Sequence, residues 1–388
     1  MTQQKPQMTS RERVLAAMRR ESVDYVPCSP AWNSLSPVQR IGKRFNFPWG
    51  PSQHEEVEYN VEELGVDPIV GCSCGGYEAA PGVSSRTWFD ADKQLIHKVY
   101  ETPAGELKST VRYDEKWPHG LDIPFFSDFT PAHCDKFWIE GEQDLECFSH
   151  VFRPVDSLDT LAALRFSFME NKRLADEFQL ATQCGIGMGL TGALQVFGPT
   201  QLAMKMLEAP DLVDAYLELD HKVNMRRVEI AIDLGIDILG RNGFYETCDF
   251  YSPAMLEQFL FDRLQAETKA AHDAGKVVPY TVNTGLMPML DYLRRLDLDC
   301  LRAVDIAHKD HDLDEIVASQ QETKSFFIGP SSAYHLQNPD TEVTRKAVRE
   351  CFRAIGRTGL IITPCPSLHS IMPWQSGLAL IDEWKKLR

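Results

Sequence analysis

The chain has 388 residues, of which 43% are apolar and 25% charged, and a formal net charge of -16. So acidic a chain lacks the Lys and Arg surplus that non-specific nucleic-acid binding requires. It contains no run of 18 apolar residues, and its polar N-terminus lacks the apolar region of a signal peptide. We therefore expect a cytoplasmic protein that does not span a membrane, and most of its ten cysteines are expected to be reduced.

The first part of the chain predicts a helix followed by two short strands. Thr9 or Ser10 can cap a helix that begins at about residue 10. Residues 24–30 predict the first strand, with prolines at its end, and residues 67–71 predict the second.

A change of pattern follows at about residue 84. The segments 87–89, 94–100 and 107–113 are β-rich and are separated by turn signals, which predicts an antiparallel meander. Residues 117–137 have no period and predict an ordered loop or lid. We expect residues 84–150 to be an insertion with lid character.

From residue 159 onward, helical segments alternate with short apolar runs. Together with the first two strands this gives eight β/α units, which predicts the α/β class and a single (β/α)8 TIM barrel over residues 1–388. An open doubly wound sheet is the alternative, but no glycine-rich phosphate loop follows the first strand. The glycines at 185, 187 and 189 lack the full fingerprint, so we interpret them as a close backbone approach to a ligand or a tight strand-to-helix turn. The predicted later strands are 178–182, 236–240, 276–281, 300–304, 325–329 and 360–363, and the predicted helices are 210–234, 252–274, 288–296, 313–320 and 341–355.

Polar side chains at the predicted strand ends are the candidate site, because barrel enzymes place their chemistry there. Glu246, Asp305 and His369 are predicted to be catalytic, as acids, bases or orienting groups. Aromatic residues near the same ends predict an apolar pocket with a few polar anchors, as small aromatic ligands require. The predicted substrate-binding residues are Trp32, Asn33, Gln183, Asn242, Tyr245, Tyr280, Asn283, Ser331 and Tyr334.

Two kinds of chemistry are open for these residues. Glu246, Cys365 and His369 offer the mixed O, S and N ligands of a zinc site, where the metal would act as a Lewis acid on a methyl-bearing heteroatom. Without a metal, Glu246 or Asp305 would be a general acid whose pKa is raised by burial, and His369 would orient it or relay the proton.

Several segments carry a shared pattern when they are taken in order: 9–17, 24–27, Thr102-Pro103-Ala104-Gly105, 250–259, Gly329-Pro330 and 359–365. Together they resemble the uroporphyrinogen decarboxylase superfamily, which also contains the cobalamin-dependent methyltransferases. The resemblance implies one barrel with its site at the C-terminal face. The decarboxylases carry an Arg-rich stretch after the first strand, whereas residues 29–34 here contain no arginine. The methyltransferases carry zinc ligands in a His-x-Cys motif, at which Thr281-Val282-Asn283 stands here, and a third ligand that corresponds to Cys365.

The resemblance implies a methyltransferase of the O-demethylase type. It would take a methyl group from a small methylated compound, with methoxylated aromatics favoured, and pass it to a corrinoid protein or to tetrahydrofolate. The chain has no corrinoid-binding run, so cobalamin would come from a partner protein. A metal-independent decarboxylase (lyase) of a small carboxylate and a non-catalytic small-molecule-binding barrel are the alternatives, and a homodimer is allowed.

Overall fold

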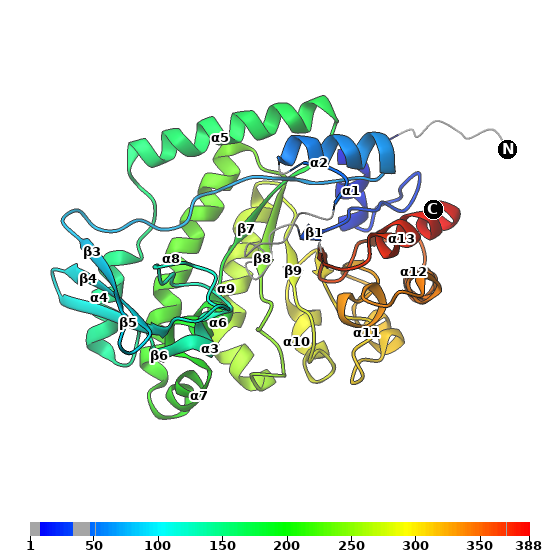
Figure 1. Ribbon diagram of the computed structural model, residues 1–388. Coiled ribbons are helices and arrows are strands. Elements are labelled where there is room, and N and C mark those ends of the chain that lie inside the picture. The colour runs from blue at the N-terminus through cyan, green and yellow to red at the C-terminus, as the bar shows by residue number, and fades with distance from the viewer. Residues whose placement is uncertain (1–7, 34–46, 51, 370) are drawn as a thin grey trace.

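A curved parallel sheet of seven strands forms the centre of the fold (Figure 1). The computed structural model describes residues 8–33, 47–50, 52–369 and 371–388. Residues 1–7, part of the polar N-terminus in which no signal peptide is expected, lie outside this description. So does Ser34, the last residue of the segment 29–34 that contains no arginine. In spatial order the strands are β12 (Leu360–Ile362), β11 (Ser325–Ile328), β10 (Cys300–Arg302), β9 (Pro279–Thr281), β8 (Ile238–Asn242), β7 (Thr182–Ile186) and β2 (Val70–Gly71).

Residues 27–29 lie between the two outermost strands of this sheet. On one side Ile362 N donates to Pro27 O and Ser29 N donates to Ile362 O, both at 2.9 Å. On the other side Asp67 N donates to Cys28 O at 2.7 Å. The segment expected as the first strand thus connects β12 to the chain entering β2 through backbone hydrogen bonds.

Helices surround the sheet, and several have the bounds that the sequence predicts. The helices α8 (Pro210–Leu234), α11 (Leu313–Gln320) and α12 (Thr341–Ile355) coincide with predicted segments. Asp312 and Asp340 cap the last two, each side chain accepting a backbone N–H of the first turn, as N-cap aspartates do. The other helices are α2 (Gln53–Tyr59), α5 (Leu158–Glu177), α6 (Gly189–Phe197), α7 (Pro199–Glu208), α9 (Pro253–Asp273), α10 (Leu290–Arg295) and α13 (Trp374–Leu387), with short helical turns at Asn60–Leu64, Met287–Met289 and Ser332–Leu336.

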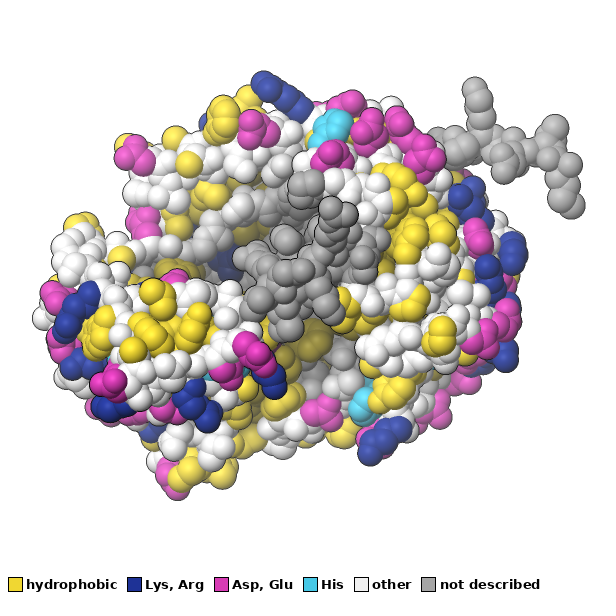
Figure 2. Space-filling model, in the orientation of Figure 1, with side chains coloured by type: hydrophobic (Ala, Val, Ile, Leu, Met, Phe, Trp, Pro, Cys, Tyr) yellow, Lys and Arg dark blue, Asp and Glu magenta, His cyan; other side chains and the backbone are white. Residues whose placement is uncertain are grey.

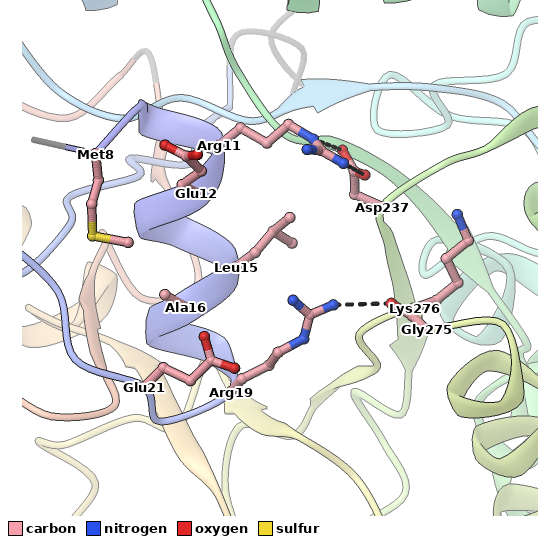
Figure 3. Close-up of a pocket in the computed structure, with 10 residues that line it drawn as sticks. All are labelled: Met8, Arg11, Glu12, Leu15, Ala16, Arg19, Glu21, Asp237, Gly275 and Lys276. Atoms are coloured by element: carbon pink, nitrogen blue, oxygen red, sulfur yellow. Dashed lines mark hydrogen bonds and ion pairs between the residues drawn. The ribbon is translucent and has the colours of Figure 1, made fainter.

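The helix α1 (Ser10–Met18) covers the N-terminal end of the sheet. Its Val14 and Met18 pack in one apolar cluster with residues that point into the sheet's interior, Ile238 and Cys300 among them. Figure 3 shows α1 beside Asp237 and the loop before β9, both at the N-terminal ends of strands. A capping box at Thr9 and Glu12 starts this helix, as the sequence indicates. The N-terminal end of the sheet is therefore filled and closed.

A separate antiparallel sheet contains β3 (Ser84–Asp90), β4 (Leu95–Thr102), β5 (Gly105–Arg112) and β6 (Cys134–Lys136), in that order. Its inner face buries Ile96, Leu107 and Val111 in the main core. The three β-rich segments expected here are confirmed as β3, β4 and β5. Helix α3 (Thr130–His133) lies between β5 and β6 in the chain and α4 (Glu142–Val151) follows β6, and Ile139 N donates to Val196 O of α6 at 3.1 Å.

Two predicted strands differ from the structure. The strand expected at 178–182 begins only at Thr182, because α5 continues to Glu177 and Gln179 then adopts a positive φ of 54°. The segment 24–30 is extended but forms only a single ladder bridge, Cys28 with Ile362. Prolines at 27 and 30 lack the N–H groups that a longer ladder would need. Within the described ranges, no helix is both long and apolar enough to cross a membrane.

Candidate functional site

A cavity of about 320 Å³ opens at the carboxyl ends of β7 and β8. The view in Figure 2 shows the surface hollowed between the antiparallel sheet and the rest of the molecule. Asn242 is the last residue of β8 and Tyr245 follows it, so two of the predicted substrate-binding residues line the cavity. The remaining lining residues are Phe126, Ser127 and Asp128 before α3, Met188, Thr191 and Gln195 at α6, and Phe244.

The polar groups of this β7–β8 cavity are held by one another. Gln195 Nε2 donates to Asp128 Oδ1 at 2.7 Å, and Tyr245 N donates to Thr191 Oγ1 at 3.2 Å. Asn242 Nδ2 contacts the Met188 sulfur at 3.4 Å. Burial, helped by the nearby Asp128, raises the pKa of Tyr245 to about 12, so its phenol stays neutral. The cavity therefore offers aromatic surface, neutral polar groups and one carboxylate.

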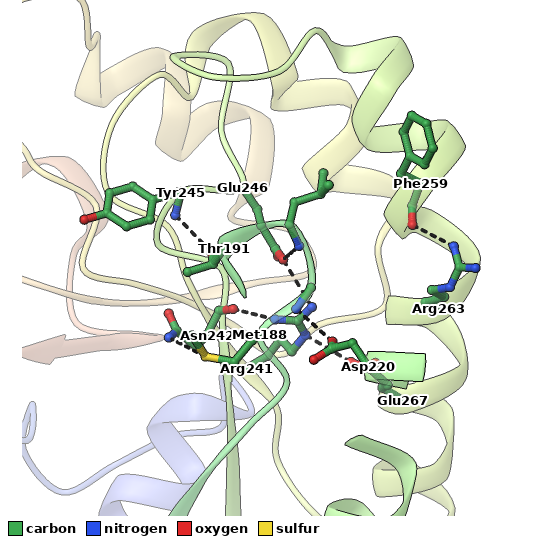
Figure 4. A network of polar contacts seen from close by, with 12 residues as sticks. Met188, Thr191, Asp220, Arg241, Asn242, Tyr245, Glu246, Phe259, Arg263 and Glu267 are labelled. Atoms are coloured by element: carbon green, nitrogen blue, oxygen red, sulfur yellow. Dashed lines mark hydrogen bonds and ion pairs between the residues drawn. The ribbon is translucent and has the colours of Figure 1, made fainter. Parts of the chain in front are cut away.

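Behind β8 lies a buried charge network (Figure 4). Arg241 Nη2 is 3.3 Å from Glu246 Oε1, and Arg241 Nε is 3.0 Å from Glu267 Oε2. Tyr280 donates its hydroxyl to Glu246 Oε2 at 2.6 Å. Asp220 on α8 accepts the N–H of Gly189 at 2.9 Å. Neighbouring residues of a strand point to opposite faces, so Asn242 points into the sheet's interior while Arg241 points toward α8 and α9.

This network holds three carboxyl groups around one guanidinium. Burial raises the pKa of Glu246 and that of Asp220, and Arg241 only partly offsets the effect. Burial would also raise the pKa of Glu267, but Arg241 and His221 together lower it. The network thus keeps Glu267 ionised and favours protonation of its other two carboxyl groups.

The glycines at 187 and 189 are explained by this network. A Cβ atom on Gly189 would lie 2.3 Å from Glu246 Oε1, and one on Gly187 would lie 2.6 Å from Arg241 Nε. Both residues also have positive φ angles, +46° and +57°. At Gly185, in contrast, a Cβ would meet nothing within 4 Å. The close backbone approach expected from this run is an approach to the Arg241–Glu246 pair.

Glu246 and Tyr280 therefore occupy a different place from the one that their strand-end positions indicate. Both side chains are fully buried, at 0% exposure, in the layer between the sheet and the helices. Neither lines the β7–β8 cavity. Besides Arg241 and Tyr280, Glu246 accepts the N–H of Leu190 in the first turn of α6 at 2.9 Å. In this geometry Glu246 fixes α6, which supplies Thr191 and Gln195 to the cavity wall and has Met188, a third lining residue, as its N-cap.

A second polar cluster forms at the carboxyl ends of β9 to β12. Ser331 donates its hydroxyl to Asp305 Oδ2 at 2.9 Å, and the Ser331 N–H donates to His335 Nδ1 at 2.9 Å. Asn283 Nδ2 donates to Ala303 O at 2.7 Å and is 3.9 Å from the Cys365 sulfur. Four predicted site residues, Asn283, Asp305, Ser331 and Cys365, thus lie together.

The three proposed metal ligands are not brought together, which corrects the expectation of a zinc set. Among the described residues, no three His, Cys, Asp or Glu side chains are grouped to hold a metal ion. The residues outside the description, 1–7, 34–46, 51 and 370, include none of these four residue types. The oxygens of Glu246 are taken by Arg241, Tyr280 and Leu190. The Cys365 thiol is 3.2 Å from Val304 O, and burial holds its pKa well above the ordinary value. The positions of the Glu246, Cys365 and His369 side chains therefore do not fit a zinc ion.

The predicted residues near the C-terminus occupy a third region. The short parallel pair β1 (Trp32–Asn33) and β13 (Leu368–His369) places Asn33 opposite His369 in the backbone register. The Trp32 ring packs in an aromatic cluster with Trp374 at 5.2 Å between centroids, and its Nε1 donates to Asn60. Burial lowers the pKa of His369, which favours its neutral form. Tyr334 is 55% exposed and has a surface position.

Several residues of the site could not be found from the sequence. Asp128 lies in a loop without periodicity. Thr191 and Gln195 lie in a helix whose other residues are apolar. His335 follows Ser331 by four residues, a spacing typical of any helical turn. Gln183 was predicted, and it accepts a hydrogen bond from Arg302, a residue that only the alternation along β10 could have indicated.

The fold and these strand-end clusters define an α/β protein built on a curved parallel sheet with its polar residues at the carboxyl ends of the strands. No family model matches the chain, and no curated protein sequence matches it. Among solved structures, the methyltransferase from Methanosarcina mazei is similar over 98% of this chain and 99% of its own, with a TM-score of 0.61 and 16% identity. At that identity the likeness concerns the fold alone.

Two further structures are similar at a lower level. A B12-independent methionine synthase from Shewanella sp. W3-18-1 has a TM-score of 0.47 and 9% identity, over 93% of this chain and 96% of its own. A 3-keto-D-glucoside 4-epimerase from E. coli has a TM-score of 0.35 and 14% identity, over 59% of this chain and 86% of its own.

Proposed function

We propose that this protein is a methyltransferase that removes a methyl group from a small methylated compound. Methoxylated aromatic compounds are the favoured donors, and a corrinoid protein or tetrahydrofolate is the acceptor. The observation that carries the proposal is the β7–β8 cavity, with aromatic and polar walls, in a fold that matches a methyltransferase over nearly the whole length of both chains. Cavities of this size and lining suit small ligands with a few polar anchors.

The proposal includes the architecture of a single domain over residues 1–388. In it, residues 27–29 are the first strand of a (β/α)8 barrel, because they hydrogen-bond on both sides. The antiparallel sheet belongs to an insertion over residues 84–150 that forms one wall of the cavity through Phe126, Ser127 and Asp128.

In this function the chain's own residues bind the donor and supply a proton to its departing oxygen. Asn242 and Tyr245 would hold the aromatic ether, since both line the cavity. We assign the proton transfer to Asp305 in its protonated form; it is hydrogen-bonded by Ser331, is 6% exposed, and belongs to the polar cluster at the ends of β9 to β12 rather than to the cavity wall. Glu246 is assigned a positioning role, because its two oxygens are occupied by Arg241, Tyr280 and the Leu190 N–H of α6. A corrinoid, when bound on a partner, would supply the nucleophile that takes the methyl group.

Methyl transfer from a panel of methoxyarenes to Co(I) cobalamin tests the proposal. We expect methylcobalamin to form, and we expect Asp305→Asn to slow its formation at least tenfold. The matched control is Asp310→Asn, an exposed aspartate in the loop that follows. Absence of methylcobalamin across the whole panel, with both Co(I) cobalamin and tetrahydrofolate offered as acceptors, would overturn the proposed function.

A further inference from the structure

Arg302 places a guanidinium inside the curved sheet. Its Nη1 donates to Gln183 Oε1 at 3.1 Å. Arg302 belongs to β10 and Gln183 to β7, and two strands, β9 and β8, lie between them in the sheet. A hydrogen bond between such distant strands can only cross the interior that the sheet encloses.

This guanidinium has no counterion. Arg13 and Arg241, the two arginines buried to 2% exposure, are each ion-paired to two carboxylates. No carboxylate among the described residues lies within 4.0 Å of Arg302, and residues 1–7, 34–46, 51 and 370 contain no Asp or Glu. The bond to Gln183 is the one hydrogen bond that this guanidinium makes within the described ranges. An unpaired cation inside a protein is unfavourable, so its retention indicates a partner that comes from outside the chain.

The neighbours of Arg302 are suited to an anion. In the ladder, Asn242 is opposite Thr281, and Thr281 is opposite Arg302. Paired residues of parallel strands point to the same face, so an amide, a hydroxyl and a guanidinium lie side by side on the interior. The Phe327 ring lies 4.9 Å below the guanidinium carbon and orients it. A Cβ on residue 240 would come within 3.2 Å of Gln183 Nε2, so Gly240 leaves room for that amide.

A ligand can reach Arg302 from one end of the sheet. Below it, the interior is filled by Ala181, Ile238, Val277, Cys300 and Ile361, each at 1% exposure or less, and by α1. Arg302 itself is only partly buried. Its solvent contact therefore comes from the C-terminal side, where Asn242 also lines the β7–β8 cavity.

We propose that Arg302, together with Gln183, Thr281 and Asn242, binds the carboxylate of a small ligand inside the barrel. A planar guanidinium beside hydroxyl and amide donors matches a carboxylate in charge and geometry. The inference rests on the proposed function in one respect: it narrows the methyl donor to an aromatic carboxylate that bears a methoxy group. The carboxylate binds at Arg302, and the ring extends toward the cavity at Asn242.

Calorimetric binding of 4-methoxybenzoate and of neutral methoxybenzene to the full chain tests this site. We expect 4-methoxybenzoate to bind at least tenfold more tightly than methoxybenzene, and Arg302→Gln to abolish that difference. Arg294→Gln, at a 60% exposed arginine, is the control and should preserve it. Equal binding of the two probes to the wild type, or an unchanged preference in Arg302→Gln, overturns the inference.

Thermal denaturation gives a second measurement on the same variants. Because Arg302 has no counterion without ligand, we expect ligand-free Arg302→Met to melt at or above the wild-type temperature. We also expect 4-methoxybenzoate to raise the melting temperature of the wild type but not of this variant. A variant that melts well below the wild type would show that Arg302 stabilises the fold instead, and would contradict the inference.

The outcome separates this site from the proposed function. Carboxylate binding that depends on Arg302, without any methyl transfer, would support the proposed carboxylate site and contradict the proposed function. Methyl transfer that is as fast from methoxybenzene as from 4-methoxybenzoate, and as fast in Arg302→Gln as in the wild type, would support the proposed function and contradict the carboxylate site. Release of CO2 from the bound carboxylate would support the site with a decarboxylase in place of a methyltransferase.

Discussion

Arg241 and Glu246 form an ion pair at 3.3 Å in the layer between the central sheet and its helices, where their side chains are 2% and 0% exposed. The pair connects β8 to the first turn of α6 through the bond from Leu190 N to Glu246. Removing Glu246 takes away one of the two carboxyl groups that face the buried Arg241, and it leaves the buried Tyr280 hydroxyl and Leu190 N–H without their acceptor.

We therefore expect Glu246→Ala to lower the free energy of unfolding by about 3–5 kcal/mol. The control is Glu257→Ala, which removes an ion pair with Arg295 in which both side chains are more than 40% exposed. Exposed pairs contribute at most about 1 kcal/mol, so the control should unfold almost as the wild type does. Urea denaturation at neutral pH measures both, and equal losses in the two variants would contradict the assigned network.

The pH dependence of stability should report on Asp220. Burial raises its pKa in the folded chain above the unfolded value of about 3.9. The unfolded state then loses this proton first as the pH rises. The contribution of Asp220 to stability is fully present below the pKa of the unfolded state and is lost as the pH rises through the pKa of the folded state.

Asp220→Asn removes this titration and keeps a carbonyl acceptor for Gly189 N. We expect the stability of this variant relative to the wild type to be higher at pH 7 than at pH 4. Asp233→Asn, at an exposed position on the same helix, should show no such trend. Urea denaturation over this pH range is the measurement, and parallel pH profiles for wild type and Asp220→Asn would refute the assignment.

The glycine run before α6 offers a test that is independent of charge. Gly189→Ala would place a methyl group 2.3 Å from Glu246 Oε1 on a backbone with a φ of +46°. Overpacking of this kind typically destabilises by about 1–3 kcal/mol, and the left-handed backbone adds to it. Gly185→Ala, where nothing lies within 4 Å, should change stability by no more than about 0.5 kcal/mol. Similar unfolding midpoints for the two variants would argue against this packing.

Zinc content is the remaining prediction. Because Glu246, Cys365 and His369 are not grouped, we expect elemental analysis to find much less than one zinc per chain. Cys365→Ser should have the same content as the wild type, and so should Cys248→Ser, at a half-buried cysteine in another loop. One zinc per chain that disappears only in Cys365→Ser would show that these ligands meet in solution after all.

The helical part of the fold could be predicted from the sequence because caps and apolar periodicity are local signals. The segments predicted at 313–320 and 341–355 are the observed α11 and α12, which Asp312 and Asp340 cap in the structure. The antiparallel strands were predictable for the same reason, since turn signals and alternation lie within a few residues of each other. The strand at 178–182 was misplaced because Phe178, Leu180 and Ala181 are apolar, yet Phe178 and Gln179 form the turn after α5 and the strand begins only at Thr182.

The role of Glu246 could not be predicted in this way. A glutamate just beyond a strand end looks like a catalytic group, and only long-range contacts show otherwise. Its partners Leu190 and Tyr280 are 56 and 34 residues away in the chain. The lack of a counterion at Arg302 likewise cannot be predicted from a sequence, because it depends on the distance of every Asp and Glu side chain from Arg302 in the fold.

The antiparallel sheet is continuous in the chain, from Ser84 to Lys136, but it is not a detachable module. Its inner face shares one core with α4, α6 and α8, in which Trp138, Phe148 and Tyr216 are all at 0% exposure. The Phe137 ring lies against Gly198, so close that a Cβ there would be 2.4 Å from it. Excising the sheet would uncover an apolar face of the size that drives self-association. Grafting or exchanging the sheet between related proteins would therefore have to carry the surfaces of α6 and α8 along with it.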